Sequence, residues 1–506
     1  MVINIKNIIF SNKSCSPLRG DYPPLDPQLL RKLLKTYTKT RNTIIYILII
    51  SFATPSPLLF ATGIELDYAV PVSERALLDQ TKTGTDIVNI SRPSWAGISK
   101  NTFREYNVSD KGVILNNSTG IGVSQLGGAL YGNPYYEGRS ADLILFEVSG
   151  KNQSHLNGYT EVFGQAADFI LANQNGIAIN GGGFINTPRA TLTTGKPFLD
   201  SNGNMSHIDV DRGQIIINEL GLDASTTDYF DIVSRVTQIN GELWGGRNLN
   251  IQAGQNRFDY HQRTVGNNPD ADTMLEKPEW GIDSTALGVV RAGRITLVGT
   301  EDGVGVKSDG EFLSLEDVNL TAEGDIEYNT IRTNKNVNVT AKGSVTQKSE
   351  TVSDGTVHIQ AEKNINLKGI KTEGKQGIVL NSDQNIAIGE SSTDSKSTDR
   401  KLTPQLYSPK DVVITAEGNI ENRSGYIESD QSISLTAKDS QINNNGVIAS
   451  LGKLVITAKV ANNKTNSQMG SVEKMNINVA EDFINSGTVY SKLDVVVAAK
   501  SFENKT

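Results

Sequence analysis

The sequence predicts an all-β chain that folds as a parallel β-helix, a solenoid with about 20 residues per coil. Three observations predict this fold: a strand pattern that recurs beyond residue 310, the lack of a helical period between its copies, and a composition rich in Gly, Asn, Thr, Ser and Val. Only 6% of the 506 residues are aromatic, which is typical of many short strands.

The repeating unit is an alternating strand that ends on alanine and is followed by a charged or Gly-containing turn. In the unbroken runs the closing alanines are 19, 20, 21 and 21 residues apart. We expect inward Val, Ile and Leu side chains to fill a narrow core and outward Thr, Asn and Lys to face water. One coil cannot bury its own apolar face, so stability comes from stacking. The copies are Val318–Ala322, Val337–Ala341, Val357–Ala361, Val412–Ala416, Ile433–Ala437 and Leu454–Ala458, with weaker ones at Ile477–Ala480 and Val495–Ala498.

Asn and Gly recur between the strands, as in Gly418–Asn422, Ser440–Gly446 and Phe483–Gly487. These residues favour turns, and asparagines at equivalent corners can form a ladder of amide hydrogen bonds between coils. Residues 389–410 interrupt the repeat with Ser-rich, Pro-containing sequence. We expect a loop there that projects from one corner of the solenoid.

The first 62 residues are typical of an export leader. Five Lys or Arg residues between Arg31 and Arg41 precede an apolar run at 44–53, which is shorter than the roughly 20 residues that span a bilayer. Small residues follow, so we expect a cleaved secretory signal with cleavage after Ala61 or Gly63. An uncleaved anchor is the alternative.

Charge and cysteine content limit the function of the exported part. The whole chain has a formal charge of −8, but residues 63–506 hold 40 basic and 54 acidic residues, a charge of −14. An acidic chain without a basic cluster argues against nucleic-acid binding. The single cysteine, Cys15, lies in the leader, so the exported part has neither a disulfide nor a thiolate metal site.

A glycine-rich stretch at 172–195, ANQNGIAINGGGFINTPRATLTTG, combines alternating aliphatic residues with sharp corners. Ile177 and Ile179 have the period of a strand with one buried face. Asn175–Gly176 supplies a corner before it, and Gly181–Gly183 permit a sharp turn or a close approach of two backbones. No residue type suited to covalent or acid–base chemistry is concentrated there.

Blocks on both sides of this stretch resemble one family. The chain is similar to the amino-terminal secretion domain of filamentous haemagglutinins and contact-dependent growth inhibition exoproteins, which are exported by the two-partner route. Ordered matches extend over about residues 64–306. The blocks are FREYNVSDKGVILNNS (103–118), SQLGGALYGNP (124–134), FGQAADFILANQNGI (163–177), GLDASTTDYFDIVSR (221–235), GELWGGRNLNIQA (241–253) and GRITLVGTEDGVGV (293–306).

The resemblance implies a right-handed β-helix with an amino-terminal cap and extra-helical β hairpins. It divides the chain into a leader (1–62), a secretion domain (63–310) and haemagglutinin-type repeats (311–506). It also implies recognition by an outer-membrane β-barrel transporter with periplasmic POTRA domains, and a location outside a Gram-negative cell. The residues it assigns to transporter recognition are Asn116, Asn117, Asn133, Pro134, Asn173, Gln174, Asn175, Gly176, Ile177, Asn180, Gly181, Gly182 and Gly183.

Two elements depart from the family pattern. Gln174 stands where the family's Asn-Pro-Asn-Gly-Ile element has Pro, and Tyr135–Tyr136 follow Asn133–Pro134 where the family has Asn-Leu. Proline would fix φ near −65°, but the flanking asparagines still permit a turn.

No catalytic, cofactor or metal site is expected. The four histidines (155, 207, 261 and 358) lie far apart and are expected at the surface or in turns. Asp209 and Asp211 alternate and could share one face of a strand, but we expect a solvated face rather than a cation site. Parallel β-helices also include polysaccharide lyases, which remain a remote alternative.

The leading function is an adhesin whose rod contacts a host or neighbouring bacterial cell. The alternative is the stalk of a contact-dependent growth inhibition toxin with a carboxy-terminal toxin in the full-length form. The repeat is still running at Thr506, so we expect a fragment or a truncated gene.

Overall fold

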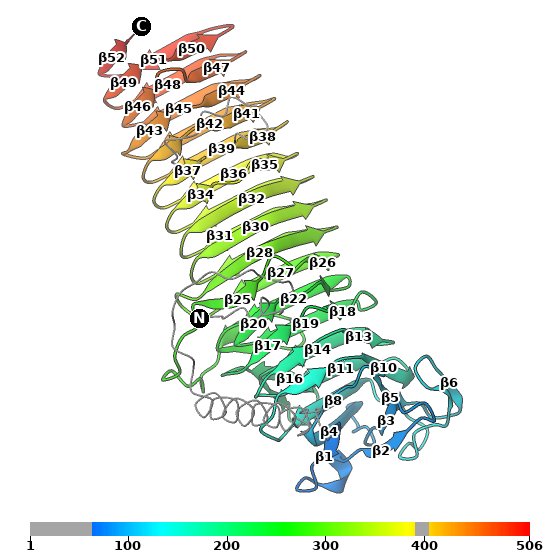
Figure 1. Cartoon of the computed structure of the whole chain (residues 1–506). Coiled ribbons are helices and arrows are strands. Elements are labelled where there is room, and N and C mark those ends of the chain that lie inside the picture. The colour runs from blue at the N-terminus through cyan, green and yellow to red at the C-terminus, as the bar shows by residue number, and fades with distance from the viewer. Residues whose placement is uncertain (1–62, 390–403, 506) are drawn as a thin grey trace, which may run out of the picture. The chain divides into compact units, whose positions relative to one another are not determined.

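The computed structural model describes residues 63–389 and 404–505. Their strands stack into a parallel β-solenoid whose coils pass through three faces (Figure 1). We call these faces A, B and C, in the order in which the chain visits them. The predicted fold class is confirmed, whereas the expected leader, its apolar run and Ala61 lie outside the described residues.

Face A is one 17-stranded sheet, and all its pairings are parallel except that of β1 with β4. Every alanine-closed copy predicted from the sequence falls on it. Its strands are β1 (Glu65–Leu66), β4 (Ile98–Glu105), β8 (Leu143–Val148), β11 (Asp168–Ala172), β14 (Arg189–Thr193), β19 (Tyr229–Ser234), β22 (Asn248–Ala253), β27 (Arg294–Gly299), β29 (Val318–Ala322), β31 (Val337–Ala341), β33 (Thr356–Ala361), β36 (Gly377–Ser382), β39 (Val412–Ala416), β42 (Ile433–Ala437), β45 (Leu454–Ala458), β48 (Met475–Val479) and β51 (Val495–Ala498).

Faces B and C belong to a second, 29-stranded sheet. They merge where three long strands run through both: β28 (Gly305–Ser314), β30 (Ile326–Thr333) and β32 (Val345–Ser353). Face B also has β9 (Ser154–Leu156), β12 (Ile177–Ile179), β17 (Gln214–Ile217), β20 (Val236–Ile239), β25 (Trp280–Ser284), β34 (Ile365–Leu367), β37 (Ile386–Ile388), β40 (Ile420–Asn422), β43 (Gln441–Asn444), β46 (Val460–Asn463), β49 (Asp482–Asn485) and β52 (Ser501–Asn504). Face C has β2 (Leu77–Gln80), β3 (Asp86–Asn89), β5 (Val113–Asn117), β10 (Tyr159–Gly164), β13 (Gly182–Ile185), β18 (Leu222–Asp223), β21 (Leu243–Trp244), β26 (Val290–Ala292), β35 (Lys371–Gly374), β38 (Gln405–Ser408), β41 (Tyr426–Ser429), β44 (Val447–Ser450), β47 (Gln468–Ser471) and β50 (Thr488–Ser491).

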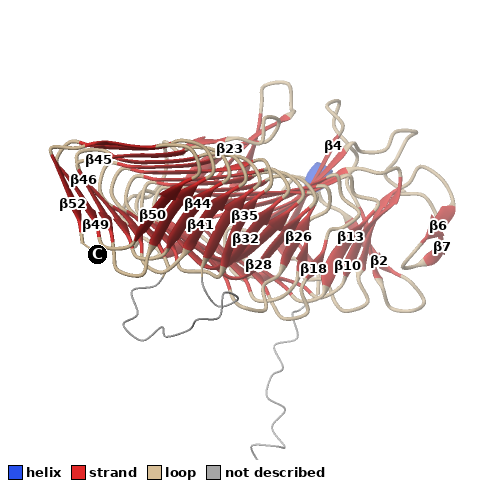
Figure 2. Ribbon diagram, turned by 90° about the horizontal axis from the view of Figure 1, so that it is seen from above, coloured by secondary structure: helices blue, strands red, loops and turns tan. Residues whose placement is uncertain are grey.

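Antiparallel strands cap the first coils and decorate the sides, as the resemblance implied. At the amino-terminal end β1 pairs with β4 and β2 pairs with β3. Two extra-helical sheets stand out from the coils in Figure 2: the hairpin β6 (Gly122–Ser124) and β7 (Gly128–Leu130), and the four-stranded sheet β15 (Lys196–Leu199), β16 (Met205–Asp209), β23 (Asn256–Asp259) and β24 (Val265–Asn267). Within residues 63–389 and 404–505 the one helical element is the 3-10 turn η1 (Val72–Glu74). No helix in this part of the chain is long and apolar enough to cross a membrane.

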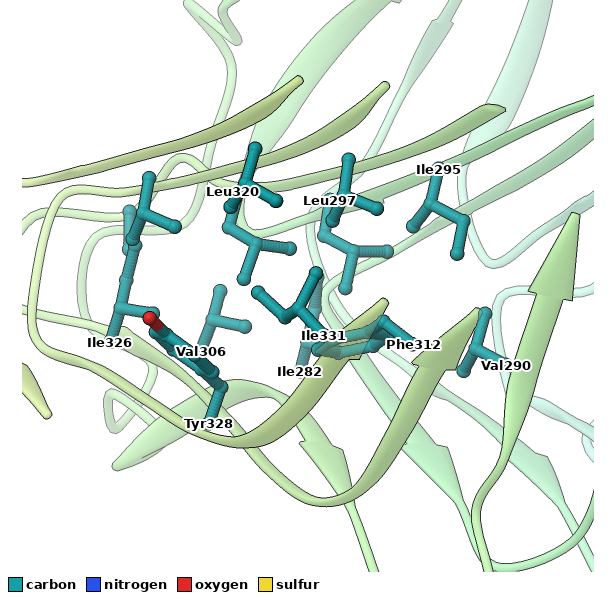
Figure 3. Close-up of a cluster of buried hydrophobic side chains, with 14 of the residues drawn as sticks. Ile282, Val290, Ile295, Leu297, Val306, Phe312, Leu320, Ile326, Tyr328 and Ile331 are labelled. Atoms are coloured by element: carbon teal, nitrogen blue, oxygen red, sulfur yellow. The ribbon is translucent and has the colours of Figure 1, made fainter. Parts of the chain in front are cut away.

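The core runs along the axis of the solenoid between the three faces. In two successive coils, Leu297 of β27 and Leu320 of β29 point inward from face A toward Val306 and Phe312 of β28 (Figure 3). All four side chains are fully buried, and the residues that alternate with them on their strands are more exposed. Strict alternation therefore places one row of aliphatic side chains from every coil in a continuous core.

In the last five coils, an asparagine stands at the end of each face B strand, and these asparagines form a ladder of hydrogen bonds. Each amide Nδ2 donates to the Oδ1 of the next asparagine at distances of 2.7–2.9 Å. The strands hold these residues in direct register. The predicted ladder is thus confirmed. Its members are Asn422, Asn444, Asn463, Asn485 and Asn504.

Replacing Asn444 by Ala is expected to lower the free energy of unfolding of the surrounding coils by about 1–3 kcal/mol. Its buried amide bonds to Asn422 and Asn463 and also donates to the carbonyl oxygen of Gln468, so several partners lose a bond at once. Hydrogen exchange of residues 404–505 would measure the change. The adjacent Asn445 is exposed and makes one side-chain bond, so Asn445→Ala is the control and should cost under about 0.5 kcal/mol. Equal losses in the two variants would contradict the role of the ladder.

Two elements differ from the sequence-based expectation. Residues 405–408, expected within the loop, form β38 and pair with β35 and β41 in face C. The alternation of Leu406 inward with Tyr407 outward is the strand signal that the neighbouring prolines obscured. Residues 390–403 lie outside the described residues. Face A also has β36 between the predicted copies, unrecognised because it closes on Ser382 instead of alanine.

Candidate functional site

The first predicted recognition element is held by a buried asparagine at the end of β5. The Oδ1 atom of Asn117 accepts hydrogen bonds from the Tyr136 hydroxyl (2.7 Å) and the Ala141 amide (2.8 Å). Its Nδ2 donates to the carbonyl oxygens of Ala141 (2.9 Å) and Gln165 (2.8 Å). One fully buried side chain therefore fastens the loop after β7 and the corner after β10 to the same coil.

The side chain of Asn133 bonds to the backbone of Asn116, 17 residues earlier in the sequence. The Asn133 Nδ2 donates to the carbonyl oxygens of Asn116 and Ile90, both at 2.8 Å. Its Oδ1 accepts the Tyr135 amide at 2.9 Å, which forms a turn with the exposed Pro134 at its second position. Tyr135, the departure from the family pattern, is also on the surface. The substitution therefore leaves the turn intact.

The second element, Asn173–Gly176, forms the corner between faces A and B. The Gly176 amide donates to the Asn173 carbonyl oxygen (3.0 Å), and the Asn173 Oδ1 accepts the Asn175 amide (2.9 Å). The Asn173 Nδ2 also donates to the Ser154 hydroxyl of the preceding coil at 3.0 Å. Asn173 is thus a structural asparagine that bonds its own turn and the coil below.

Gln174 lies exposed at the second position of this turn, where the family has proline. Neither Gln174 nor Asn175 has a positive φ, whereas Gly176 has φ 111°. A turn in which neither central residue needs a positive φ accepts most residue types at its second position. Gln174 therefore fits the corner that proline would pre-form, and Ile177 enters the core directly after it.

The glycine run begins at the corner between faces B and C and continues into β13, and its first and third residues have different steric requirements. Gly181 has φ 87°, which favours glycine. Gly183 faces the ring of Tyr159 on the preceding coil, and an added Cβ would lie 2.4 Å from its Cε1 atom. Beside the run, the Asn180 Oδ1 accepts the Leu220 amide of the next coil at 3.1 Å. A Cβ added at Gly183 would also lie 2.7 Å from the carbonyl oxygen of Asp223 on the next coil, so the predicted close approach of two backbones is present at Gly183.

These elements do not meet in one site. Asn117 ends face C, Asn173 precedes face B, and Gly181 lies between faces B and C. Four of the asparagines are buried in the folded chain, and exposure is confined to Pro134, Gln174 and Asn175. Local sequence predicted the turns but missed the long-range partners, such as Tyr136 and Gln165 of Asn117.

The expectation that Asp209 lies on a solvated strand face is wrong. Asp209 is buried, and both of its oxygens accept hydrogen bonds from the Arg257 guanidinium at 2.6 Å. Asp211 instead accepts from the Gln255 amide and the Asp272 backbone. Arg257 lies on β23, 48 residues from Asp209, so no local pattern could have found the pair. In the described ranges no three His, Cys, Asp or Glu residues are grouped to hold a metal ion.

A buried charge cluster, missed by the sequence, joins the four-stranded extra-helical sheet to face A. The fully buried Asp231 of β19 accepts hydrogen bonds from Arg189 (2.8 Å) and from two nitrogens of Arg263 (2.9 and 2.7 Å). The Arg189 guanidinium lies 3.7 Å from the ring centre of Tyr260. Burial raises the pKa of the neighbouring Asp168 carboxyl, although Arg189 opposes the shift. The cluster fixes the extra sheet by charge as well as by packing.

Three histidines lie half-buried on strands rather than in turns, which corrects part of the expectation. His155 is on β9, His207 on β16 and His358 on β33, whereas His261 is in an exposed turn. The His207 ring stacks on Phe198 with 4.9 Å between ring centres. His207 therefore has a packing role that its isolated position in the sequence did not reveal.

The arrangement of cap, coils and extra-helical hairpins matches known proteins. A family model described as the TPS secretion domain, where TPS stands for two-partner secretion, matches residues 63–328. The chain belongs to this family. The crystal structure of a filamentous hemagglutinin secretion domain is 31% identical, superposes with a TM-score of 0.55, and covers 59% of this chain and 99% of its own.

Curated relatives of this TPS exoprotein are much longer. "Toxin CdiA" from Yersinia pestis is 40% identical over 263 residues, 52% of this chain and 8% of the relative. "tRNA nuclease CdiA" from Escherichia coli (strain NC101) is 39% identical over 308 residues, 60% of this chain and 9% of the relative. The chain thus spans less than a tenth of these relatives.

Proposed function

We propose that residues 63–310 direct export through an outer-membrane β-barrel transporter that recognises them with periplasmic POTRA domains. The observation that carries the proposal is the family match over residues 63–328. The burial of Asn116, Asn117 and Asn133 also bears on when the transporter recognises the chain. Buried residues cannot contact a transporter in the folded chain, so recognition through them takes place on the unfolded chain, whose strands can pair with the partner by β-augmentation.

Folding outside the cell then follows the order of emergence. The first coils carry the cap and form a template on which each later coil stacks. Stacking removes the emerged chain from the unfolded pool, which favours outward movement. In this proposal the same asparagines act twice, first as recognised residues and then as the side chains that fasten the first coils.

Coexpression with the cognate transporter tests the proposal. We expect wild-type chain in the medium, none with a transporter that lacks its POTRA domains, and at least tenfold less of Asn117→Ala. Asn444→Ala is the matched control because Asn444 is equally buried and amide-bonded but lies beyond the secretion domain. We expect its secretion to stay close to wild type. Export without the transporter would refute the proposal, and equal losses in both variants would reduce Asn117 to a general folding role.

We propose that the repeat region 311–506, whose described residues 311–389 and 404–505 form a rod, serves in adhesion to a host or neighbouring bacterial cell. Its face A strands carry polar side chains outward coil after coil, a geometry suited to holding binding surfaces away from a membrane. The names of the CdiA relatives favour a second candidate, the stalk of a toxin-delivery protein. Sequencing downstream of the gene separates the two: a continuing frame with a small immunity gene favours toxin delivery, and further repeats favour adhesion.

A further inference from the structure

One row of outward residues on face C contains aromatic and aliphatic side chains. Strand pairing places these residues in register, one per coil, along the solenoid. The row follows the strands β10, β13, β18 and β26 in Figure 1 and continues onto β32. It comprises Tyr159, Gly183, Asp223, Trp244, Arg291, Leu313, Arg332 and Val352.

Two adjoining hollows lie along this row. The first, of about 560 Å³, extends from Trp244 past Leu313 to Val352. The second, of about 430 Å³, extends from Tyr159 over Gly181–Gly182 to Trp244. Trp244 and Ser225 line both, so the hollows form one groove parallel to the solenoid axis. Pockets of this size with aromatic walls and a few polar groups are typical small-ligand sites.

The two aromatic rings of the groove are held in place. The Tyr159 ring covers Gly183, and its hydroxyl donates to the Asp223 Oδ2 atom at 2.8 Å. The Arg291 guanidinium lies 5.4 Å from the ring centre of Trp244, which is 44% exposed. Strand pairing separates the two rings by three coil steps, roughly 14 Å. Rigid, partly exposed rings at fixed spacing supply contact area at low entropic cost.

Charge in the groove is balanced within the protein. Arg291 donates to the Glu242 carboxylate at 2.6 Å. Arg332 pairs with Glu350, and Asp354 pairs with Lys375. No arginine along the row is therefore left to attract an anion.

Asp223 is the exception to this pairing. Burial opposes its ionisation, but hydrogen bonds from Ser225 and Tyr159 outweigh burial and lower the pKa of the carboxyl. The groove therefore presents a carboxylate held by neutral donors, which disfavours anionic ligands.

We propose that this groove binds an uncharged oligosaccharide along the axis of the solenoid. The rings of Tyr159 and Trp244 pack against the C–H faces of sugar units. The Asp223 carboxylate and the exposed Asn334 amide exchange hydrogen bonds with hydroxyl groups at two points along the groove. The groove lies mostly within residues 63–310 and reaches the first coils of the rod, so the proposal extends the adhesive role to the end of the rod that adjoins the secretion domain. It rests on that role for its setting, but binding itself requires only the folded chain.

Glycan-array binding by the purified full chain tests the proposal separately from secretion. The probes are uncharged gluco-, manno- and N-acetylglucosamine oligosaccharides, with heparin oligosaccharides as the charged comparison. We expect binding to at least one uncharged series, with an affinity that salt does not change. Trp244→Ala should weaken it at least tenfold, and Ser225→Tyr should do the same by filling the junction of the hollows.

Trp95→Ala is the matched control because Trp95 is 97% exposed in a turn away from the groove. Its affinity should equal that of the wild-type chain, and circular dichroism should show folded protein for all three variants. No binding to any uncharged series, binding to heparin alone, or equal binding by Trp244→Ala and the wild-type chain would each overturn the proposal. Export of the wild-type chain without the transporter, or no export with the intact transporter, would overturn only the proposed route of secretion if glycan binding stays intact.

Discussion

Replacing Phe146 by Ala is expected to lower the free energy of unfolding of the amino-terminal coils by about 3–5 kcal/mol. The fully buried Phe146 ring lies 4.7 Å from Phe103, 5.1 Å from Tyr106 and 5.3 Å from Phe169, measured between ring centres. Its removal leaves a cavity and breaks three aromatic contacts, each worth about 0.5–1.5 kcal/mol beyond burial.

Hydrogen exchange resolved by coil is the measurement for Phe146→Ala, because a solenoid with nearest-neighbour contacts need not unfold in one step. Protection should fall in β4, β8 and β11 and stay unchanged beyond β40. Phe312→Ala is the matched control, since Phe312 is equally buried but has no aromatic neighbour among the described residues. A loss in Phe146→Ala no larger than in Phe312→Ala would show that the aromatic contacts add nothing.

Replacing Asp231 by Ala is expected to destabilise the coils around β19 by about 3–5 kcal/mol and to release the four-stranded extra-helical sheet. The substitution leaves the Arg189 and Arg263 guanidinium groups without their shared carboxylate. Breaking a buried ion pair by removing one partner exposes an uncompensated charge to the low-dielectric interior. Proteolysis and hydrogen exchange of residues 196–209 and 256–267 would measure the release.

Two further variants separate the role of charge at Asp231 from that of packing. Glu323→Ala removes one partner of the exposed ion pair with Lys342 and should cost less than about 1 kcal/mol. A variant with apolar residues in place of Arg189, Asp231 and Arg263 together should recover most of the lost stability, because no charge is left buried. Unchanged protection of the sheet in Asp231→Ala would contradict the proposed anchoring.

The sequence predicted what depends on periodicity and local turn chemistry. Val318, Leu320 and Ala322 alternate with polar residues, so face A and its inward row followed directly. The Asn173–Gly176 corner followed from residue types that favour turns. These features depend on residues that are close together in the sequence. Their steric and hydrogen-bonding preferences do not depend on the tertiary structure.

Contacts between distant coils could not be predicted. Asp231 meets Arg189 and Arg263 from 42 and 32 residues away, and an unbroken alternating pattern does not specify which outward residues become buried by an added sheet. The same limit explains Asp209. The alternating pattern around Asp209 predicts an exposed carboxylate. In the structure β23 covers it, and β23 is too far away in the sequence for a local pattern to predict this contact.

The asparagine ladder gives the rod a direction. Backbone bonds to Gly425 and Gln468 fix the orientation of the amides of Asn422 and Asn444, and each Nδ2 in the row donates toward the carboxy terminus. Every new coil therefore supplies the acceptor for a donor that the previous coil already holds out, and aligned amides polarise one another. Each coil that is added pairs the donor of the coil before it and supplies the donor for the coil after it, so the ladder extends in one direction only, toward the carboxy terminus.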